Sequence, residues 1–177
     1  AHLERWGVPT SRIVELDWWE TTSVGQLTIG AGWARHFSGR AIKRNRTLWA
    51  AWSIIGPKHR AFHSGDTGEF EGFAENGRRY GAFDVTMIKI GAYGPTWPDI
   101  HLTPEQAVRA HQLVGGKLFI PMHWGTFNLA YHQWKEPAVR VVPAAAAAGV
   151  PIVMPKPGQL IEPASPPPLD KWWEAIS

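Results

Sequence analysis

The sequence predicts an α/β domain in which helices and a β-sheet form layers. Strand-like segments come first in the chain, and helical and strand-like segments alternate after them. That order is typical of layered α/β and α+β folds. Three of the turns that follow predicted strands carry a histidine or an aspartate, so the ends of the strands are the expected place for chemistry.

The strands are predicted from alternating or continuous apolar runs bounded by turn residues. The clearest alternation is Leu27, Ile29, Ala31 and Trp33. Strands are expected at residues 13–16, 24–34, 47–55, 60–64, 84–90 and 117–121, with short ones at 152–154 and 159–162. Gly56-Pro57 joins two of them as a hairpin. Residues 21–23 are expected to be a turn.

The helices are predicted from caps and breakers. Residues 1–6 resemble the last turn of a helix that Gly7 ends. Residues 69–79 form a second helix. Thr103, Pro104 and Gln106 form a capping box with proline at the first helical position, and this third helix ends at Gly115. A fourth is expected at 137–148, kinked or restarted by Pro143.

Composition excludes some kinds of site. The 177 residues include no cysteine, so a metal would be held by histidine and carboxylate. The net charge is +3, and the only dense basic cluster is residues 40–46, so no nucleic-acid partner is expected. The 11 tryptophans are explained by packing or by contact with a lipid surface. With no apolar run long enough to span a membrane, a cytoplasmic or peripheral membrane location is expected.

Three side chains are candidate metal ligands. His36, Asp66 and His123 each lie one to three residues beyond a predicted strand. Strand ends fix the backbone while the side chain faces a cleft, which suits ligands that arrive from different elements. Taken singly, each has a structural alternative: the histidines as surface residues and Asp66 as a turn residue that accepts backbone N–H groups. His63 and His111 are interpreted as structural.

A series of short motifs carries a resemblance to a known family. In order, they are Ala34-Arg35-His36-Phe37-Ser38-Gly39-Arg40, Leu48-Trp49, Gly65-Asp66-Thr67-Gly68, Ile90-Gly91-Ala92-Tyr93, His101 with Pro104-Glu105-Gln106-Ala107-Val108, and His123-Trp124-Gly125-Thr126-Phe127. This series resembles the metallo-β-lactamase superfamily. Within it, the chain looks like the branch of N-acyl-phosphatidylethanolamine-hydrolysing phospholipase D and its bacterial relatives. The resemblance covers roughly residues 1–162.

The resemblance implies an αββα sandwich and a zinc-dependent phosphodiesterase that uses a metal-bound hydroxide. By motif, His36 and His123 match histidine ligands of the two zinc ions, and Asp66 matches the carboxylate that bridges them. His101 matches a histidine beside the substrate, a proton donor or phosphate contact, which makes Asp66 and His101 the expected catalytic residues. Arg40 is a weaker candidate for phosphate contact. Tyr93 is expected to line the substrate pocket or to pack beside it.

The family's His-x-His-x-Asp-His motif is absent from this sequence. Residues 1–162 are therefore expected to be the C-terminal half of the sandwich, with 163–177 as a proline-rich linker and short amphipathic tail. The expected partners are the N-terminal half of the same domain and a phosphodiester or lipid substrate, with peripheral membrane contact. This chain alone is expected to be inactive.

Two other hypotheses remain open at this point. The same fold hosts many chemistries, so a lactonase or a nuclease fits the motifs as well. Alternatively, the chain is a non-catalytic half-domain that acts as a binding or assembly module. A half-sandwich would expose an apolar face, and it is then expected to form a homodimer or to require a partner chain.

Overall fold

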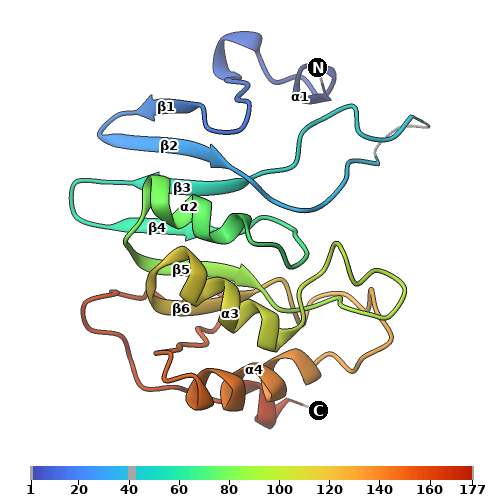
Figure 1. Ribbon diagram of the computed structural model, residues 1–177, viewed down its shortest axis with the longest axis vertical. Coiled ribbons are helices and arrows are strands. Elements are labelled where there is room, and N and C mark those ends of the chain that lie inside the picture. The colour runs from blue at the N-terminus through green and yellow to red at the C-terminus, as the bar shows by residue number, and fades with distance from the viewer. Residues whose placement is uncertain (1, 40–42, 177) are drawn as a thin grey trace.

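One six-stranded sheet organises the chain, in the order β1-β2-β3-β4-β5-β6 (Figure 1). The computed structural model describes residues 2–39 and 43–176. The strands are β1 (Thr21–Val24), β2 (Leu27–Gly32), β3 (Ala51–Ile55), β4 (Arg60–His63), β5 (Phe83–Lys89) and β6 (Gly116–Met122). The first four pair antiparallel, and β4, β5 and β6 pair parallel. The mixed layered fold expected from the sequence is confirmed.

The helices are α1 (His2–Arg5), α2 (Gly72–Tyr80), α3 (Pro104–Val114) and α4 (Glu136–Ala147), with short 3-10 turns at Thr10–Arg12 and Trp172–Ala175. Helices α2 and α3 lie in front of the sheet in Figure 1, and α4 lies beside α3. The predicted capping box is present at Thr103, and Gly115 ends α3 in the left-handed conformation with φ 76°. Helix α4 continues through Pro143 instead of restarting there. Among the described residues, no helix is long and apolar enough to cross a bilayer.

Three strand predictions are wrong. Residues 13–16 form no strand, whereas the expected turn at 21–23 lies within β1, which pairs with β2. Gly25, with φ 59°, begins a two-residue turn between them. β1 is an exposed edge strand, so it needs no apolar alternation and lacks the usual sequence signal. Near the C-terminus, 159–162 forms no strand, and Ile152 makes only an isolated bridge to Phe119.

The core lies between the sheet and the helices. Phe62 of β4 meets Phe73 of α2 with ring centroids 6.5 Å apart, and Thr86 of β5 is hydrogen bonded to His111 of α3. Because side chains alternate along a strand, the neighbours of Phe62 point to the opposite face of the sheet. His111 is buried, so its structural role is confirmed.

The C-terminal stretch expected to be a tail packs onto this core. Trp173 is only 1% exposed, and its ring meets Trp124 edge to face at 5.7 Å between centroids. Trp172 donates from its indole nitrogen to the Met154 carbonyl oxygen at 2.9 Å. The tail therefore supports the loop that follows β6, which carries one of the predicted ligands.

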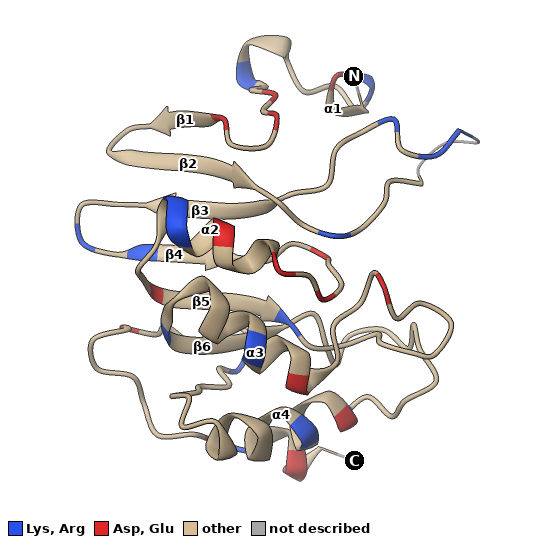
Figure 2. Ribbon diagram, in the orientation of Figure 1, with Lys and Arg blue, Asp and Glu red and all other residues tan. Residues whose placement is uncertain are grey.

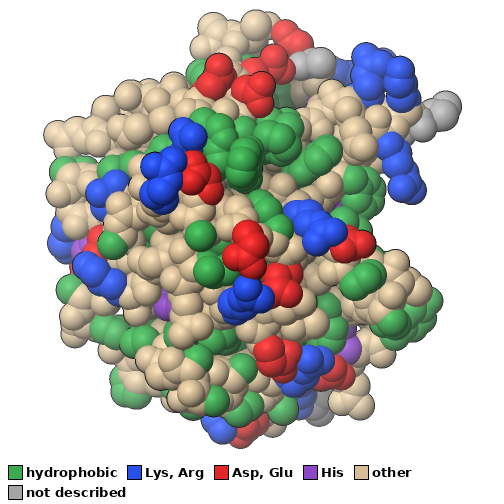
Figure 3. Space-filling model, in the orientation of Figure 1, with side chains coloured by type: hydrophobic (Ala, Val, Ile, Leu, Met, Phe, Trp, Pro, Cys, Tyr) green, Lys and Arg blue, Asp and Glu red, His purple; other side chains and the backbone are tan. Residues whose placement is uncertain are grey.

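Charged side chains of both signs are interspersed over the helical face (Figures 2 and 3). Several are paired: Arg140 with Glu105 at 2.7 Å, and Arg109 with Glu71 at 2.7 Å. Such exposed pairs each contribute little to stability. The face drawn in Figure 3 carries no continuous stripe of positive charge.

Candidate metal centre

The candidate ligands meet at one edge of the sheet. Strands β2, β4, β5 and β6 run in the same direction, because two antiparallel pairings separate β2 from β4 and the pairings of β4 with β5 and of β5 with β6 are parallel. Their carboxyl ends therefore share an edge. His36 follows β2, Asp66 follows β4, His101 lies in the loop between β5 and α3, and His123 directly follows β6.

A tight turn aims Asp66 at this edge. The amide of Gly65 donates to Nδ1 of His63 at 3.0 Å, which is the structural role expected of that histidine. Gly65 has φ 63°, and a β-carbon there would lie 2.4 Å from the Ala50 carbonyl oxygen. Glycine is therefore required at this position on two counts, the backbone conformation and the close approach of the residue that precedes β3.

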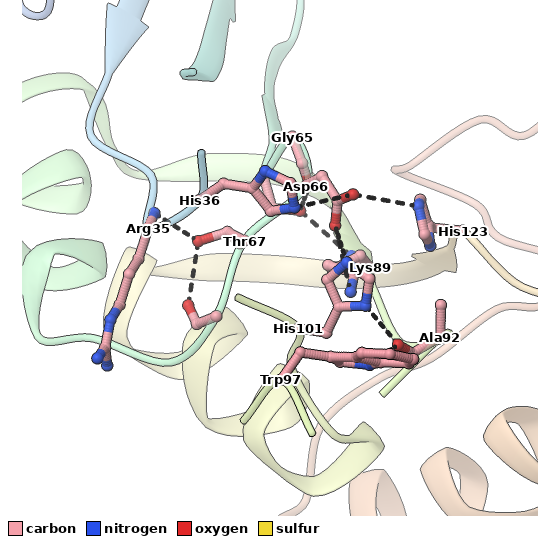
Figure 4. A network of polar contacts seen from close by, with 12 residues as sticks. Arg35, His36, Gly65, Asp66, Thr67, Lys89, Ala92, Trp97, His101 and His123 are labelled. Atoms are coloured by element: carbon pink, nitrogen blue, oxygen red, sulfur yellow. Dashed lines mark hydrogen bonds and ion pairs between the residues drawn. The ribbon is translucent and has the colours of Figure 1, made fainter. Parts of the chain in front are cut away.

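Asp66 is the centre of the group (Figure 4). Its Oδ2 lies 3.3 Å from Nε2 of His36 and 3.6 Å from Nε2 of His123. Its Oδ1 lies 3.4 Å from Nε2 of His101 and 3.2 Å from Nζ of Lys89. Three imidazoles and one ammonium thus face a single carboxylate.

Backbone carbonyls fix the tautomers of two of these imidazoles. Nδ1 of His36 lies 2.8 Å from the Phe37 carbonyl oxygen, and Nδ1 of His101 is hydrogen bonded to the Ala92 carbonyl oxygen. A carbonyl oxygen only accepts, so each Nδ1 carries the proton and donates it. In a neutral ring of this tautomer, Nε2 carries the lone pair that can bind a metal, and in a protonated ring the same atom donates toward Asp66.

The donor set fits a metal ion. His36, Asp66 and His101 each offer one ligand atom, and these three atoms lie within 4.8 Å of one another. Within the described part of the chain, the buried atoms His36 Nε2 and Asp66 Oδ1 have no hydrogen-bond partner. Buried polar atoms are normally paired, so unpartnered atoms on two members of this group fit a site that can accept a cation. Nitrogen and carboxylate oxygen are ligands that zinc accepts.

The charges keep Asp66 ionised. Burial alone would raise the Asp66 pKa, but the imidazoles of His101, His123 and His36 and the ammonium of Lys89 outweigh it and hold the pKa far below its usual range. The carboxylate at 3.3 Å raises the pKa of His36 in turn. These neighbours therefore favour the ionised carboxylate, the form in which Asp66 can bind a metal.

The predicted site residues have different outcomes. The structure brings His36, Asp66 and His123 together, and His101 lies close enough to Asp66 to join the possible ligand set. Tyr93 is buried, and its hydroxyl donates to Glu136 at 2.6 Å rather than being free for a substrate. Arg40 lies outside the described residues.

Sequence analysis missed Lys89. It is 0% exposed, and burial lowers its pKa to about 8 although Asp66 partly offsets that effect. The signal available in the sequence was a lysine between Ile88 and Ile90, inside an apolar run. In the folded chain this lysine is enclosed rather than solvated.

An apolar pocket of about 360 Å³ opens beside His123. It is lined mainly by the loop after β6, including Trp124, Phe127, Leu129 and Trp134. Phe127 is 77% exposed and Tyr131 of the same loop 89%. One wall of the candidate centre is thus aromatic and apolar, with large side chains presented outward.

The family model for the β-lactamase superfamily domain matches residues 1–124. This chain belongs to that family. The family expected from the motif series is confirmed. A relative named as a metal-dependent hydrolase, from Pyrobaculum aerophilum, is 25% identical over 78% of this chain and 57% of the relative.

Several relatives are longer than this chain. An uncharacterised protein of Mycobacterium tuberculosis is 51% identical over 176 residues, covering 98% of this chain and 47% of the relative. N-acyl-phosphatidylethanolamine-hydrolysing phospholipase D 1 of Caenorhabditis elegans is 35% identical over 71% of this chain and 37% of the relative. The chain thus spans about half the length of the curated relatives it matches.

Solved structures support the family's fold. Igni18, a metallo hydrolase of Ignicoccus hospitalis, superposes with a TM-score of 0.61 at 22% identity, covering 82% of this chain and 58% of that one. YhfI of Bacillus subtilis, a metallo-β-lactamase fold protein, gives a TM-score of 0.61 at 14% identity, over 84% and 55%. At these identities the likeness concerns the fold alone.

Proposed function

We propose that this chain supplies part of the two-zinc centre of a phosphodiesterase of the phospholipase D type. The observation that carries the proposal is the convergence of three imidazole Nε2 atoms on Asp66, at distances of 3.3–3.6 Å. In a centre of this kind, bound zinc lowers the pKa of water and stabilises negative charge on phosphoryl oxygens. His36, Asp66 and His123 are the residues that would hold the metal.

The remaining ligands would come from the N-terminal half of the domain. An open face of the sheet supports this partner. Trp52, His63, Met87 and Ile120 are register partners across β3 to β6, so they share one face, opposite the face that Phe62 presents to the helices. Trp52 is exposed and the other three are half-buried. A second sheet packed there would complete an αββα sandwich, and the chain by itself would be inactive.

His101 is proposed as the proton donor to the leaving alkoxide. The Ala92 carbonyl oxygen fixes its ring, and its Nε2 is directed into the site, 3.4 Å from Asp66 Oδ1. Its nearness to His36 also fits a ligand role. The variant His101→Gln separates the two roles. If His101 is the proton donor, the variant enzyme loses activity by about 10²–10⁴-fold while its zinc content is unchanged. If His101 is a metal ligand, the variant loses zinc as well.

The apolar pocket supports a substrate with a lipid part. A phosphodiester held between His36 and His123 would have its apolar portion within reach of Trp124 and Phe127. The relatives in Caenorhabditis elegans and Saccharomyces cerevisiae whose names include phospholipase D point to the same class. The outward Phe127, Leu129 and Tyr131 favour peripheral contact with a lipid surface, where aromatic side chains partition well.

The test uses the full-length protein that contains this chain. Zinc content is measured after purification, and hydrolysis is followed on an N-acylated glycerophospholipid, a lactone and an RNA. We expect about two zinc ions per domain and activity on the phospholipid. The variant Asp66→Asn should lose both, whereas Asp84→Asn, at the opposite end of β5, should retain both because its carboxylate pairs with Lys117 and not with the site.

The other outcomes identify the competing functions. Zinc with activity only on the lactone or on RNA would replace the phosphodiesterase proposal by another hydrolase on this fold. RNA cleavage should also weaken steeply with salt. If the folded full-length protein contains no zinc and hydrolyses none of the substrates, the remaining hypothesis is a binding or assembly module.

A further inference from the structure

Lys89 is a buried cation placed against the centre of the candidate site. It is the last residue of β5 and is fully enclosed. Its Nζ lies 3.2 Å from Asp66 Oδ1 and has no directional hydrogen bond within the described ranges 2–39 and 43–176. Enclosing an ammonium with one ionic partner is costly. The arrangement therefore needs a reason beyond packing.

The backbone around Lys89 leaves little freedom to move away. Its amide donates to Oγ of Ser64, two residues before Asp66, at 3.2 Å. Its position in β5 is paired with Met122 of β6, the residue before His123. The side chain thus starts from a rigid strand between two of the segments that carry candidate ligands, and it reaches Asp66 from below in Figure 4.

The two oxygens of Asp66 have different neighbours. Oδ2 faces His36 and His123, whose Nε2 atoms would share a metal ion with it. Oδ1 faces His101 and the ammonium of Lys89. One oxygen is therefore surrounded by candidate metal ligands, while the other already has a cation of the protein's own beside it.

We propose that Lys89 is a positioning residue that competes with the metal ion for Asp66. In the metal-free protein, the ammonium holds the carboxylate in the orientation that faces His36 and His123. When a cation binds, the two positive charges repel each other across the same carboxylate, so Lys89 weakens metal binding. Because Nζ is sealed from solvent, it acts through Asp66 and does not touch a substrate. This inference rests on the proposed metal centre.

The sign of the effect distinguishes this role from ordinary packing. Removing a residue that only supports the fold loosens the ligands and weakens metal binding. Removing a competing cation has the opposite effect: the metal binds more tightly, while the metal-free protein loses the ion pair that holds Asp66. Tighter metal binding together with a less stable metal-free form is the signature.

The experiment compares full-length wild type with Lys89→Met and Lys89→Gln. The first keeps the length of the side chain without its charge, and the second also keeps hydrogen-bond donors. Zinc affinity is measured by competition with a chelator of known affinity, and thermal unfolding is measured on the metal-free proteins. We expect both variants to bind zinc at least about tenfold more tightly and to melt at a lower temperature without it. Lys117→Met, on the exposed side of β6, should leave the zinc affinity unchanged.

Unchanged or weaker zinc binding in the folded variants overturns the inference while leaving the metal centre intact. A wild-type protein that binds no zinc overturns the metal centre and this inference together. If neither variant folds, the inference is tested by structures of the metal-free and zinc-loaded wild-type protein. Nζ within hydrogen-bond distance of Asp66 Oδ1 in the metal-free form supports the inference, and Nζ turned to another partner there overturns it.

Discussion

Gly91 and His123 approach each other so closely that no side chain fits between them. A β-carbon on Gly91 would lie 2.2 Å from the carbonyl oxygen of His123. His123 itself has φ 61°, in the left-handed region that non-glycine residues rarely adopt. The loop after β6 is thus held in an unusual conformation next to the loop after β5, and that conformation directs a candidate ligand toward Asp66.

The variant Gly91→Ala should therefore displace His123 without altering any ligand. The clash is with backbone, which cannot give way as a side chain can, so we expect weaker zinc binding and a stability loss of about 1–3 kcal/mol. Zinc affinity and urea unfolding of the full-length protein measure the two effects. Gly94→Ala is the matched control, since a β-carbon there meets only the Trp97 ring at ordinary contact distance, 3.4 Å.

Equal zinc affinities in the two alanine variants would mean that the backbone position of His123 does not control the metal centre. The same result would weaken the assignment of His123 as a ligand, because a displaced ligand cannot bind as before. A loss in Gly91→Ala alone connects the geometry of this loop to metal binding.

The positions of the candidate ligands at the strand ends could be predicted from sequence because they depend on local signals. His36, Asp66 and His123 each follow a strand that its apolar pattern reveals, and parallel strands bring their carboxyl ends to one edge. Capping at Thr103 is equally local, since both partners lie within four residues. These features need no knowledge of which distant segments touch.

The missed features depend on contacts between distant segments. Lys89 is buried only once the chain has folded around it. Trp173 is buried where it contacts Trp124, which lies 49 positions earlier in the chain. Pairing with β2 makes β1 a strand, although its own residues are mostly exposed. The hydroxyl of Tyr93 is engaged by Glu136 of α4, which no spacing in the sequence indicates.

The packing of Trp173 predicts a stabilising role for the C-terminal stretch. Trp173→Ala should cost about 3–5 kcal/mol, because a fully buried tryptophan leaves a large cavity. Leu160→Ala, at a side chain 93% exposed, should change stability by less than about 0.5 kcal/mol. Unfolding in guanidinium measures both. Similar small losses at the two positions would indicate that residues 163–177 are a loosely attached tail.

The apolar pocket gives a prediction about substrate preference. Ala130→Trp places a large side chain in the lining beside Leu129 and should raise the KM for a long-chain phospholipid by about tenfold or more. A short-chain phosphodiester, which does not need the pocket, should be hydrolysed as before. Comparable losses on both substrates would mean that this wall serves the metal centre itself and not an acyl chain.

Buried His111 predicts that stability falls in mild acid. Its ring is hydrogen bonded to Thr86 and stacked near Phe119, and burial lowers its pKa from 6.5 to about 4. Between those two pH values the imidazole of His111 is protonated in the unfolded chain and neutral in the folded chain. Stability is therefore lost as the pH falls from 6.5 to 4. The expected loss is about 3 kcal/mol, at about 1.4 kcal/mol per pH unit.

The variant His111→Gln isolates this contribution, because an amide can keep a hydrogen bond to Thr86 but does not titrate. The free energy of unfolding of metal-free wild type and variant is measured by urea between pH 7 and pH 4. Wild type should lose about 3 kcal/mol more than the variant over that range. Parallel pH profiles would show that His111 is protonated in the folded protein without penalty, and that its enclosure between α3 and β5 is looser than its burial indicates.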